Sequence, residues 1–236
     1  MRRTHSPTRP PRARRRAHRT VIHGDTLRDD YFWLHEKENP AVISYLEAEN
    51  AYAEASMKPT AELQQTLYRE MVARIKETDD SVPYREGAHL YYTRTEEGKQ
   101  YPVYCRKPLR GKSDEGEVTL DLNRMARGHS FMAVGDYEVS PDGRLLAYTT
   151  DTTGFREYTL RVKDLSTGKH LRTRVERVSS VCWAADNETL FYVVDDPVTK
   201  RSHRLYRQRL GERGELIQEE PDEMFNLEVG LTRSRA

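Results

Sequence analysis

A hairpin-like pattern returns at nearly regular intervals along the chain, and few folds can accommodate such a return. In YEVSPDGRLLAYTTD (137–151), two apolar runs flank a turn at Asp142-Gly143. A second copy places Asp186-Asn187 at this turn 44 residues later, and a fainter copy places Glu86-Gly87 there 56 residues earlier. Glycine and asparagine tolerate the positive φ that tight hairpins require, so we expect these pairs to be architectural.

A second strand-like element recurs at almost the same intervals. The segment YTLRVKDL (158–165) alternates apolar and polar residues, as a strand with one solvated face does. When it is aligned on Leu165, similar segments end at Leu210, 45 residues later, and at Leu109, 56 residues earlier. Two landmarks that recur in phase predict four-stranded units of about 45 residues, which are the blades of a β-propeller. A β-sandwich also has short strands and turns, but it does not explain this recurrence.

Helical periodicity precedes the repeats, over about residues 40–77. Asn39 can cap the first helix, and Met57-Lys58-Pro59-Thr60 is expected to end it and to cap the next. In the second helix, apolar residues recur every four positions and form one stripe: Leu63, Leu67, Met71 and Ile75. Two such helices cannot bury their stripes completely against each other, so we expect them to dock on a larger body that need not be part of this chain.

The first 20 residues have a distinct composition. They contain no acidic residue and eight arginines: Arg2, Arg3, Arg9, Arg12, Arg14, Arg15, Arg16 and Arg19. The other 31 basic residues face 38 acidic residues, which gives the rest of the chain a net charge of −7. Nucleic-acid tails, nuclear signals and transit peptides share this arginine density. Because residues 1–20 lack apolar periodicity, we expect a disordered arm. We expect no nucleic-acid partner, since the remaining sequence lacks a basic, aromatic-bearing surface.

No segment is apolar and long enough to predict a secretory signal or a membrane span. We therefore expect a soluble, cytoplasmic protein without a membrane partner. Cys105 and Cys182 both lie inside strand-like runs, where a free thiol packs as a small apolar side chain. Two such cysteines predict neither a disulfide scaffold nor a metal site.

The sequence contains no catalytic motif, and we predict no catalytic, cofactor-binding or metal-binding residue and no cofactor. A serine nucleophile on a strained elbow requires Gly-x-Ser-x-Gly. The segments GKSDE (111–115) and GHSFM (128–132) each lack the second glycine. Gly111 also begins a phosphate-loop-like Gly-Lys-Ser, but Arg106 occupies the position of the required first glycine.

Two further features near the N-terminus have a functional and a structural interpretation. His23 lies near Asp25 and Asp29-Asp30 and could act as a base or a ligand, but its His-Gly-Asp context favours a local turn. The cluster Tyr31-Phe32-Trp33 could bind a partner. Its position just before the helices favours a hydrophobic anchor.

Several longer stretches resemble a known family. HGDTLRDDYFWL (23–34) resembles the N-terminal signature of the prolyl oligopeptidase family of serine peptidases, and YLEAENAY (45–52) is similar to the helix that follows it. Four stretches are similar to the oligopeptidase B branch, which cleaves short peptides after Arg or Lys: RIKETDDSVPYR (74–85), EEGKQYPVYCRK (96–107), DTTGFREYTLRVKDL (151–165) and VSSVCWAADNETLFYV (178–193). The resemblance runs from about Val21 to the last residue.

The resemblance implies a domain organisation. In the family, an N-terminal helical arm packs on a C-terminal α/β-hydrolase domain, and a seven-bladed propeller covers the active site and admits only small substrates. By this analogy, we expect a mainly β chain with a disordered arm (1–20), a helical arm (21–78) and a partial β-propeller of about three blades (79–236). The family's reaction is acyl transfer by a His-activated serine. Neither that catalytic triad, nor the oxyanion hole, nor the acidic residues that select a basic side chain can be assigned to this chain.

Two functions remain open at this point. The first is the N-terminal and propeller segment of an oligopeptidase B-like serine peptidase, which gates substrate access and is inactive alone. Its partner would be the missing hydrolase domain, and short basic peptides would be substrates of the complete enzyme only. The second is a stand-alone or self-associating propeller-like module that binds a peptide or protein. FNLEVGLTRSRA (225–236) ends inside a strand-like run, which favours the first, and uncovered blade faces predict marginal stability and self-association.

Overall fold

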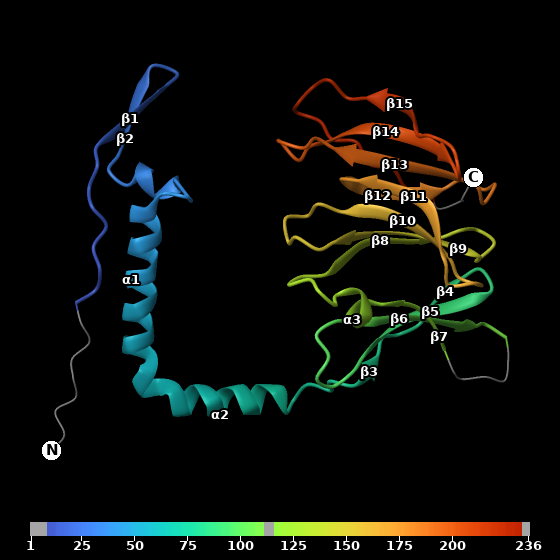
Figure 1. Cartoon of the computed structure of the whole chain (residues 1–236), viewed down its shortest axis with the longest axis horizontal. Helices are drawn as coiled ribbons and strands as arrows, with labels where there is room; N and C mark the ends of the chain where they lie inside the picture. Colours follow the sequence, from blue (N-terminus) through green and yellow to red (C-terminus); the bar gives the residue numbers. More distant parts are fainter. Residues whose placement is uncertain (1–8, 111–115, 233–236) are drawn as a thin grey trace. The chain divides into compact units, whose positions relative to one another are not determined.

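The computed structural model describes residues 9–110 and 116–232 and divides the chain into two compact units, residues 1–75 and 76–236 (Figure 1). The first unit begins with a β-hairpin and continues into helices. Its elements are β1 (His18–Ile22), β2 (Asp25–Asp29), a 3-10 helix (Phe32–His35), α1 (Pro40–Met57), a 3-10 turn (Lys58–Thr60) and α2 (Ala61–Val72). In the described residues, no helix is long and apolar enough to cross a membrane.

The two predicted helices are present. The Asn39 side chain accepts a 2.9 Å hydrogen bond from the Ala41 backbone N–H, which confirms it as the cap of α1. The predicted cap of α2 is wrong, because the Thr60 hydroxyl instead donates to the Met57 carbonyl oxygen at 2.7 Å. The second helix ends at Val72, earlier than expected. The predicted apolar stripe of Leu63, Leu67, Met71 and Ile75 is exposed, at 47–63% of each residue's surface.

The expected boundary between a disordered arm and the rest at residue 20 differs from the structure, in which β1 already begins at His18. Trp33 is buried, and its indole N–H donates to the Arg14 carbonyl oxygen at 2.9 Å. The Arg16 guanidinium lies 4.7 Å from the centre of the Trp33 ring, within the range of a cation–π contact. Trp33 thus holds this irregular segment together with the 2.8 Å bond from the Arg16 backbone N–H to the Asp30 carbonyl oxygen, and the segment has no apolar periodicity. Residues 1–8 of the expected arm lie outside the described residues.

The second unit contains three antiparallel sheets stacked face to face, which are the blades (Figure 1). Blade 1 comprises β3 (Asp79–Asp80), β4 (Tyr84–Glu86), β5 (His89–Thr95), β6 (Val103–Pro108) and β7 (Glu117–Asp121), followed by α3 (Leu122–Met125). Blade 2 comprises β8 (Ala133–Val139), β9 (Leu145–Asp151), β10 (Thr159–Asp164) and β11 (His170–Glu176). Blade 3 comprises β12 (Val178–Trp183), β13 (Thr189–Asp195), β14 (Ser202–Arg209) and β15 (Glu215–Glu219). This confirms the mainly β class and the partial propeller of about three blades.

The recurring turns occupy equivalent positions in the three blades. Gly87, Gly143 and Asn187 have φ values of +56°, +75° and +62°, and they lie in the hairpins β4–β5, β8–β9 and β12–β13. The second landmark falls on β6, β10 and β14, each of which is the next-to-last strand of its blade in chain order. The strand expected near the C-terminus is wrong for residues 225–232, which form no strand. In this segment, isolated hydrogen bonds take the place of regular strand pairing. For example, the Leu227 backbone N–H donates to the Ser202 carbonyl oxygen.

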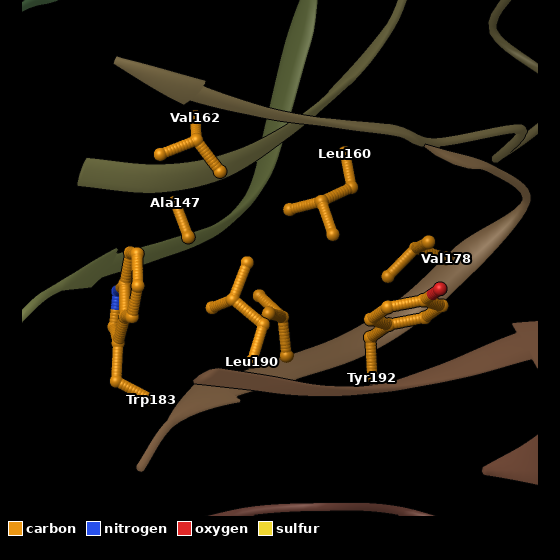
Figure 2. Close-up of a cluster of buried hydrophobic side chains, with 8 residues drawn as sticks. Ala147, Leu160, Val162, Val178, Trp183, Leu190 and Tyr192 are labelled. Carbon is orange, nitrogen blue, oxygen red and sulfur yellow. The ribbon is translucent and has the colours of Figure 1, made fainter. Parts of the chain in front are cut away.

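Two apolar clusters join the blades. The cluster between blades 2 and 3 is drawn in Figure 2 and contains Ala147, Leu160, Val162, Val178, Val181, Trp183, Leu190 and Tyr192. The cluster between blades 1 and 2 contains Leu120, Leu122, Met132, Leu146, Tyr148 and Leu165. Because side chains alternate along β9, Leu146 and Tyr148 face blade 1 while Ala147 faces blade 3. Blade 2 therefore packs its two faces against blade 1 and blade 3.

Candidate functional site on the inner strands

The first strands of blades 2 and 3, β8 and β12, lie next to each other and define an inner surface of the second unit. The Trp183 indole N–H donates to the Glu138 carbonyl oxygen at 2.9 Å, which fastens the two strands. On β8, the hydroxyl of Tyr137 donates to the Thr119 hydroxyl of blade 1 at 2.6 Å. Burial raises the pKa of Tyr137, so this phenol stays protonated and can keep donating. The inner surface is thus held by polar bonds between all three blades.

A cavity of about 230 Å³ opens where these strands meet the first hairpin turns. Its lining is aromatic and acidic: Tyr84, Glu86, Tyr137, Glu138, Val139, Pro141, Trp183, Ala185 and Leu231. Such a volume accommodates one side chain better than a folded segment. Aromatic rings beside carboxylates suit a cationic group.

Carboxylates continue from this cavity into a groove between β8, β12 and residues 228–232. Asp136, Glu138 and Glu228 line the groove. Burial raises the pKa of Asp136, the Val181 backbone N–H opposes this rise, and the negative charge of Glu228 adds to it. One Asp136 carboxylate oxygen, Oδ2, is buried and has no hydrogen-bond partner among the described residues. The inner surface therefore combines a confined space with negative charge, which attracts cationic ligands.

The cysteines are buried free thiols, as the sequence predicts. Burial raises the pKa of both Cys105 and Cys182, so neither is an activated nucleophile. No group of three or more His, Cys, Asp or Glu side chains within residues 9–110 and 116–232 is arranged to hold a metal ion. Of the two serine segments considered from the sequence, 111–115 lies outside the described residues.

The two N-terminal features have structural roles in the first unit. His23 and Gly24 form the turn between β1 and β2, with φ values of +53° and +88°. In the aromatic cluster, Trp33 is buried and anchors the preceding segment, whereas Tyr31 and Phe32 remain exposed at 42% and 39%. Our sequence reasoning missed the acidic inner surface. The signal for it in the sequence is the pair Asp136 and Glu138, which lie two residues apart on β8.

The chain is similar in sequence to a known protein family and to several peptidases. The family model of the prolyl oligopeptidase N-terminal β-propeller domain matches residues 10–236. The chain is 42% identical to dipeptidyl aminopeptidase BI from Pseudoxanthomonas mexicana over 231 residues, which covers 89% of this chain and 32% of that protein. It is 37% identical to protease 2 from Moraxella lacunata over 234 residues, covering 95% of this chain and 34% of that protein.

Among solved structures, oligopeptidase B from Leishmania major superimposes with a TM-score of 0.81 at 29% identity. The match covers 92% of this chain and 34% of that one. The chain thus spans about a third of the length of the relatives that it matches.

Proposed function

This chain belongs to the prolyl oligopeptidase family through its N-terminal β-propeller domain, and we propose that it controls substrate entry in an oligopeptidase B-like serine peptidase. In this proposal the propeller admits short peptides and excludes folded proteins. The bond is cleaved by a His-activated serine of the family's hydrolase domain, and no residue of this chain is assigned to that step. The cytoplasmic location expected from the sequence belongs to the same proposal.

The acidic inner surface is the observation that supports basic peptides as the substrate class. Asp136, Glu138 and Glu228 line one groove, and Glu138 also borders the neighbouring cavity with Glu86. A cleft lined by one sign of charge concentrates ligands of the opposite sign and speeds their entry. Peptides that carry Arg or Lys are such ligands. The carboxylates would therefore guide basic peptides without taking part in cleavage.

A chimera tests this proposal. The chain replaces the matching N-terminal third of Moraxella lacunata protease 2, and hydrolysis is measured on basic peptides of increasing length and on a folded protein. We expect short peptides to be cleaved and the folded protein to be spared. Cleavage of the folded protein at a rate comparable to that of the peptides contradicts the gate.

Charge variants of the same chimera test the acidic surface. In Asp136→Asn with Glu138→Gln, we expect kcat/KM for an Arg peptide to fall about three- to tenfold at low salt, with little change in kcat. The loss should shrink as salt is added. Glu212→Gln, which removes a carboxylate from a different groove, is the matched control. An unchanged kcat/KM in the double variant contradicts the guiding role.

A further inference from the structure

A second groove lies between blades 1 and 2, with a volume of about 630 Å³. Blade 1 supplies β7, α3 and the loop after it, and blade 2 supplies β9, β10 and β11. The groove has a buried apolar floor formed by Leu120, Met132 and Tyr148, which are 3%, 5% and 1% exposed. The groove therefore lies directly on the packed interface between blades 1 and 2.

Basic side chains surround this floor on both blades: Arg124, His129, Arg161, Lys163 and His170. Arg161 and Lys163 are two residues apart on β10 and therefore project from the same face of the strand. In the strand register, Lys163 pairs with His170 on β11. A bond of 2.7 Å between the Tyr148 hydroxyl and His170 Nε2 fixes the imidazole. Three guanidinium or ammonium groups thus converge from α3 and β10.

No carboxylate of the described residues pairs directly with the permanent cations of this groove. Among the described residues, neither Arg124, Arg161 nor Lys163 forms an ion pair, whereas Arg106, Arg144 and Arg209 do. The Lys163 ammonium group donates to the Thr119 carbonyl oxygen, a neutral acceptor, at 2.6 Å.

Asp121 is the one carboxylate among the described residues that line the groove. Its Oδ1 atom accepts the Arg124 backbone N–H as the cap of α3. Three permanent positive charges therefore face one lining carboxylate, and the nearby Glu117 carboxylate, which also acts on Lys163, is paired with Arg106.

The electrostatic environment of two groups agrees with this geometry. Desolvation lowers the pKa of Lys163, and the charge of Arg124 lowers it further, while Glu117 opposes both. Desolvation also lowers the pKa of His170, with further lowering by Lys163 and Arg161. The positive charges of Arg124 and Lys163 therefore repel each other across the groove. A bound anion would relieve that repulsion.

We propose that this groove binds a small ligand with several adjacent phosphate groups, such as an inorganic polyphosphate or the triphosphate of a nucleotide. Two guanidinium forks match phosphate oxygens bidentately, and Lys163 adds a point charge. The hydroxyls of Thr150 and Thr152 also line the groove and can donate to oxygens. The volume falls within the range of small-molecule sites and exceeds what a single inorganic phosphate fills.

Such a ligand would connect the two blades. Arg124 belongs to the segment that follows blade 1, whereas Arg161 and Lys163 belong to blade 2. A ligand that binds only the folded arrangement stabilises it in proportion to its concentration relative to Kd. The bound anion is therefore expected to raise the melting temperature of the full chain. This inference does not depend on the proposed peptidase gate.

The test measures binding to the purified full chain by calorimetry and thermal melting, with tripolyphosphate, adenosine triphosphate and inorganic phosphate as separate probes. We expect tripolyphosphate to bind and to raise the melting temperature, and inorganic phosphate to bind at least about tenfold more weakly because it engages fewer cations. Equal affinity for adenosine triphosphate assigns recognition to the phosphates alone, and tighter binding adds a contact with the nucleoside. Absence of binding by both polyphosphates overturns the proposal.

Substitutions locate the site. Arg124→Gln and Arg161→Gln should each weaken tripolyphosphate binding by about tenfold. Arg127→Gln is the matched control, because Arg127 is exposed just beyond α3 and does not line the groove. Arg124 is itself exposed, so its substitution should leave the melting temperature of the ligand-free chain unchanged. Wild-type affinity in both groove variants, or equal loss in Arg127→Gln, overturns the assignment.

Discussion

The indole nitrogen of Trp183 on β12 donates to the main-chain oxygen of Glu138 on β8 across a distance of 2.9 Å. The ring is 1% exposed and lies in the cluster with Ala147 and Leu190 that Figure 2 shows. A single side chain thus contributes both apolar packing and a polar bond between blades 2 and 3. Since the carbonyl belongs to Glu138 on β8, the same bond also positions the acidic inner surface.

Replacement of this tryptophan should loosen the contact between blades. In Trp183→Phe, the Glu138 carbonyl loses its indole donor and the smaller ring leaves a void. We expect the free energy of unfolding to fall by about 1–3 kcal/mol, measured by urea denaturation. Phe155→Leu, at a residue that is 75% exposed, is the control and should change it by less than about 0.5 kcal/mol. A Trp183→Phe value equal to that of the control contradicts the role of the bond.

The turn of blade 3 offers a separate test of backbone strain. Asn187 has a φ of +62°, and its side-chain oxygen accepts the Asp142 backbone N–H from the turn of blade 2 at 2.8 Å. Asn187→Gly loses this bond but keeps the backbone freedom, whereas Asn187→Ala loses both. We expect Asn187→Ala to be less stable than Asn187→Gly by about 1 kcal/mol in thermal or urea unfolding. Equal stability of the two variants would show that the turn relaxes to a negative φ.

These turns show why part of the fold could be predicted from the sequence. A positive φ restricts the residue types at Gly87, Gly143 and Asn187, and the restriction recurs with the blade period. The blade repeat was therefore predictable. Isolated long-range contacts of Trp33 and Asp30 hold the segment around Arg14 and leave no period in the sequence, so the start of ordered structure was misplaced.

The acidic surface and the cationic groove were not predictable for a related reason. Asp136 and Glu228 line one groove although 92 residues separate them in the sequence. Likewise, Arg124 approaches Lys163 only because blade 1 packs on blade 2. A charged residue in the sequence does not predict a site by itself, because the packing of the sheets determines which charged residues become neighbours. The local patterns identified blades, whereas the sites depend on contacts between them.

Buried tyrosines predict sensitivity to alkaline pH. Burial raises the pKa of Tyr192 to about 12, and its ring is 4% exposed. An unfolded chain releases the phenol proton near pH 10, so the folded state binds more protons between about pH 10 and 12 and loses stability there as pH rises. We expect Tyr192→Phe to make this decline shallower, measured as urea midpoints across that range. Tyr68→Phe, at an exposed position of α2, is the control. The same slope in both variants contradicts the assignment to Tyr192.

The contacts of Trp33 predict where trypsin first cuts the N-terminal segment. Arg12 is exposed and precedes the part held by Trp33, whereas the Arg14 carbonyl and the Arg16 guanidinium both contact the indole. We expect cleavage after Arg12 before cleavage at Arg14–Arg16, followed by intact mass measurement. Trp33→Ala should remove this order, and Phe155→Leu in the second unit should preserve it. Simultaneous cleavage at all these arginines in the wild-type chain would contradict an ordered segment.

The exposed stripe of α2 predicts self-association of the purified chain. Leu63, Leu67 and Met71 are 58%, 47% and 59% exposed, so one helix face presents contiguous apolar surface to the solvent. Such patches promote association, because burial of apolar area is favourable. At micromolar concentration, sedimentation velocity should reveal species larger than a monomer, and Leu67→Gln with Met71→Gln should shift the population towards the monomer. Glutamine preserves helix propensity, so the helical content should persist. Glu70→Gln changes charge without apolar area and is the control. A wild-type chain that sediments as a single sharp monomer would show that this stripe does not drive self-association.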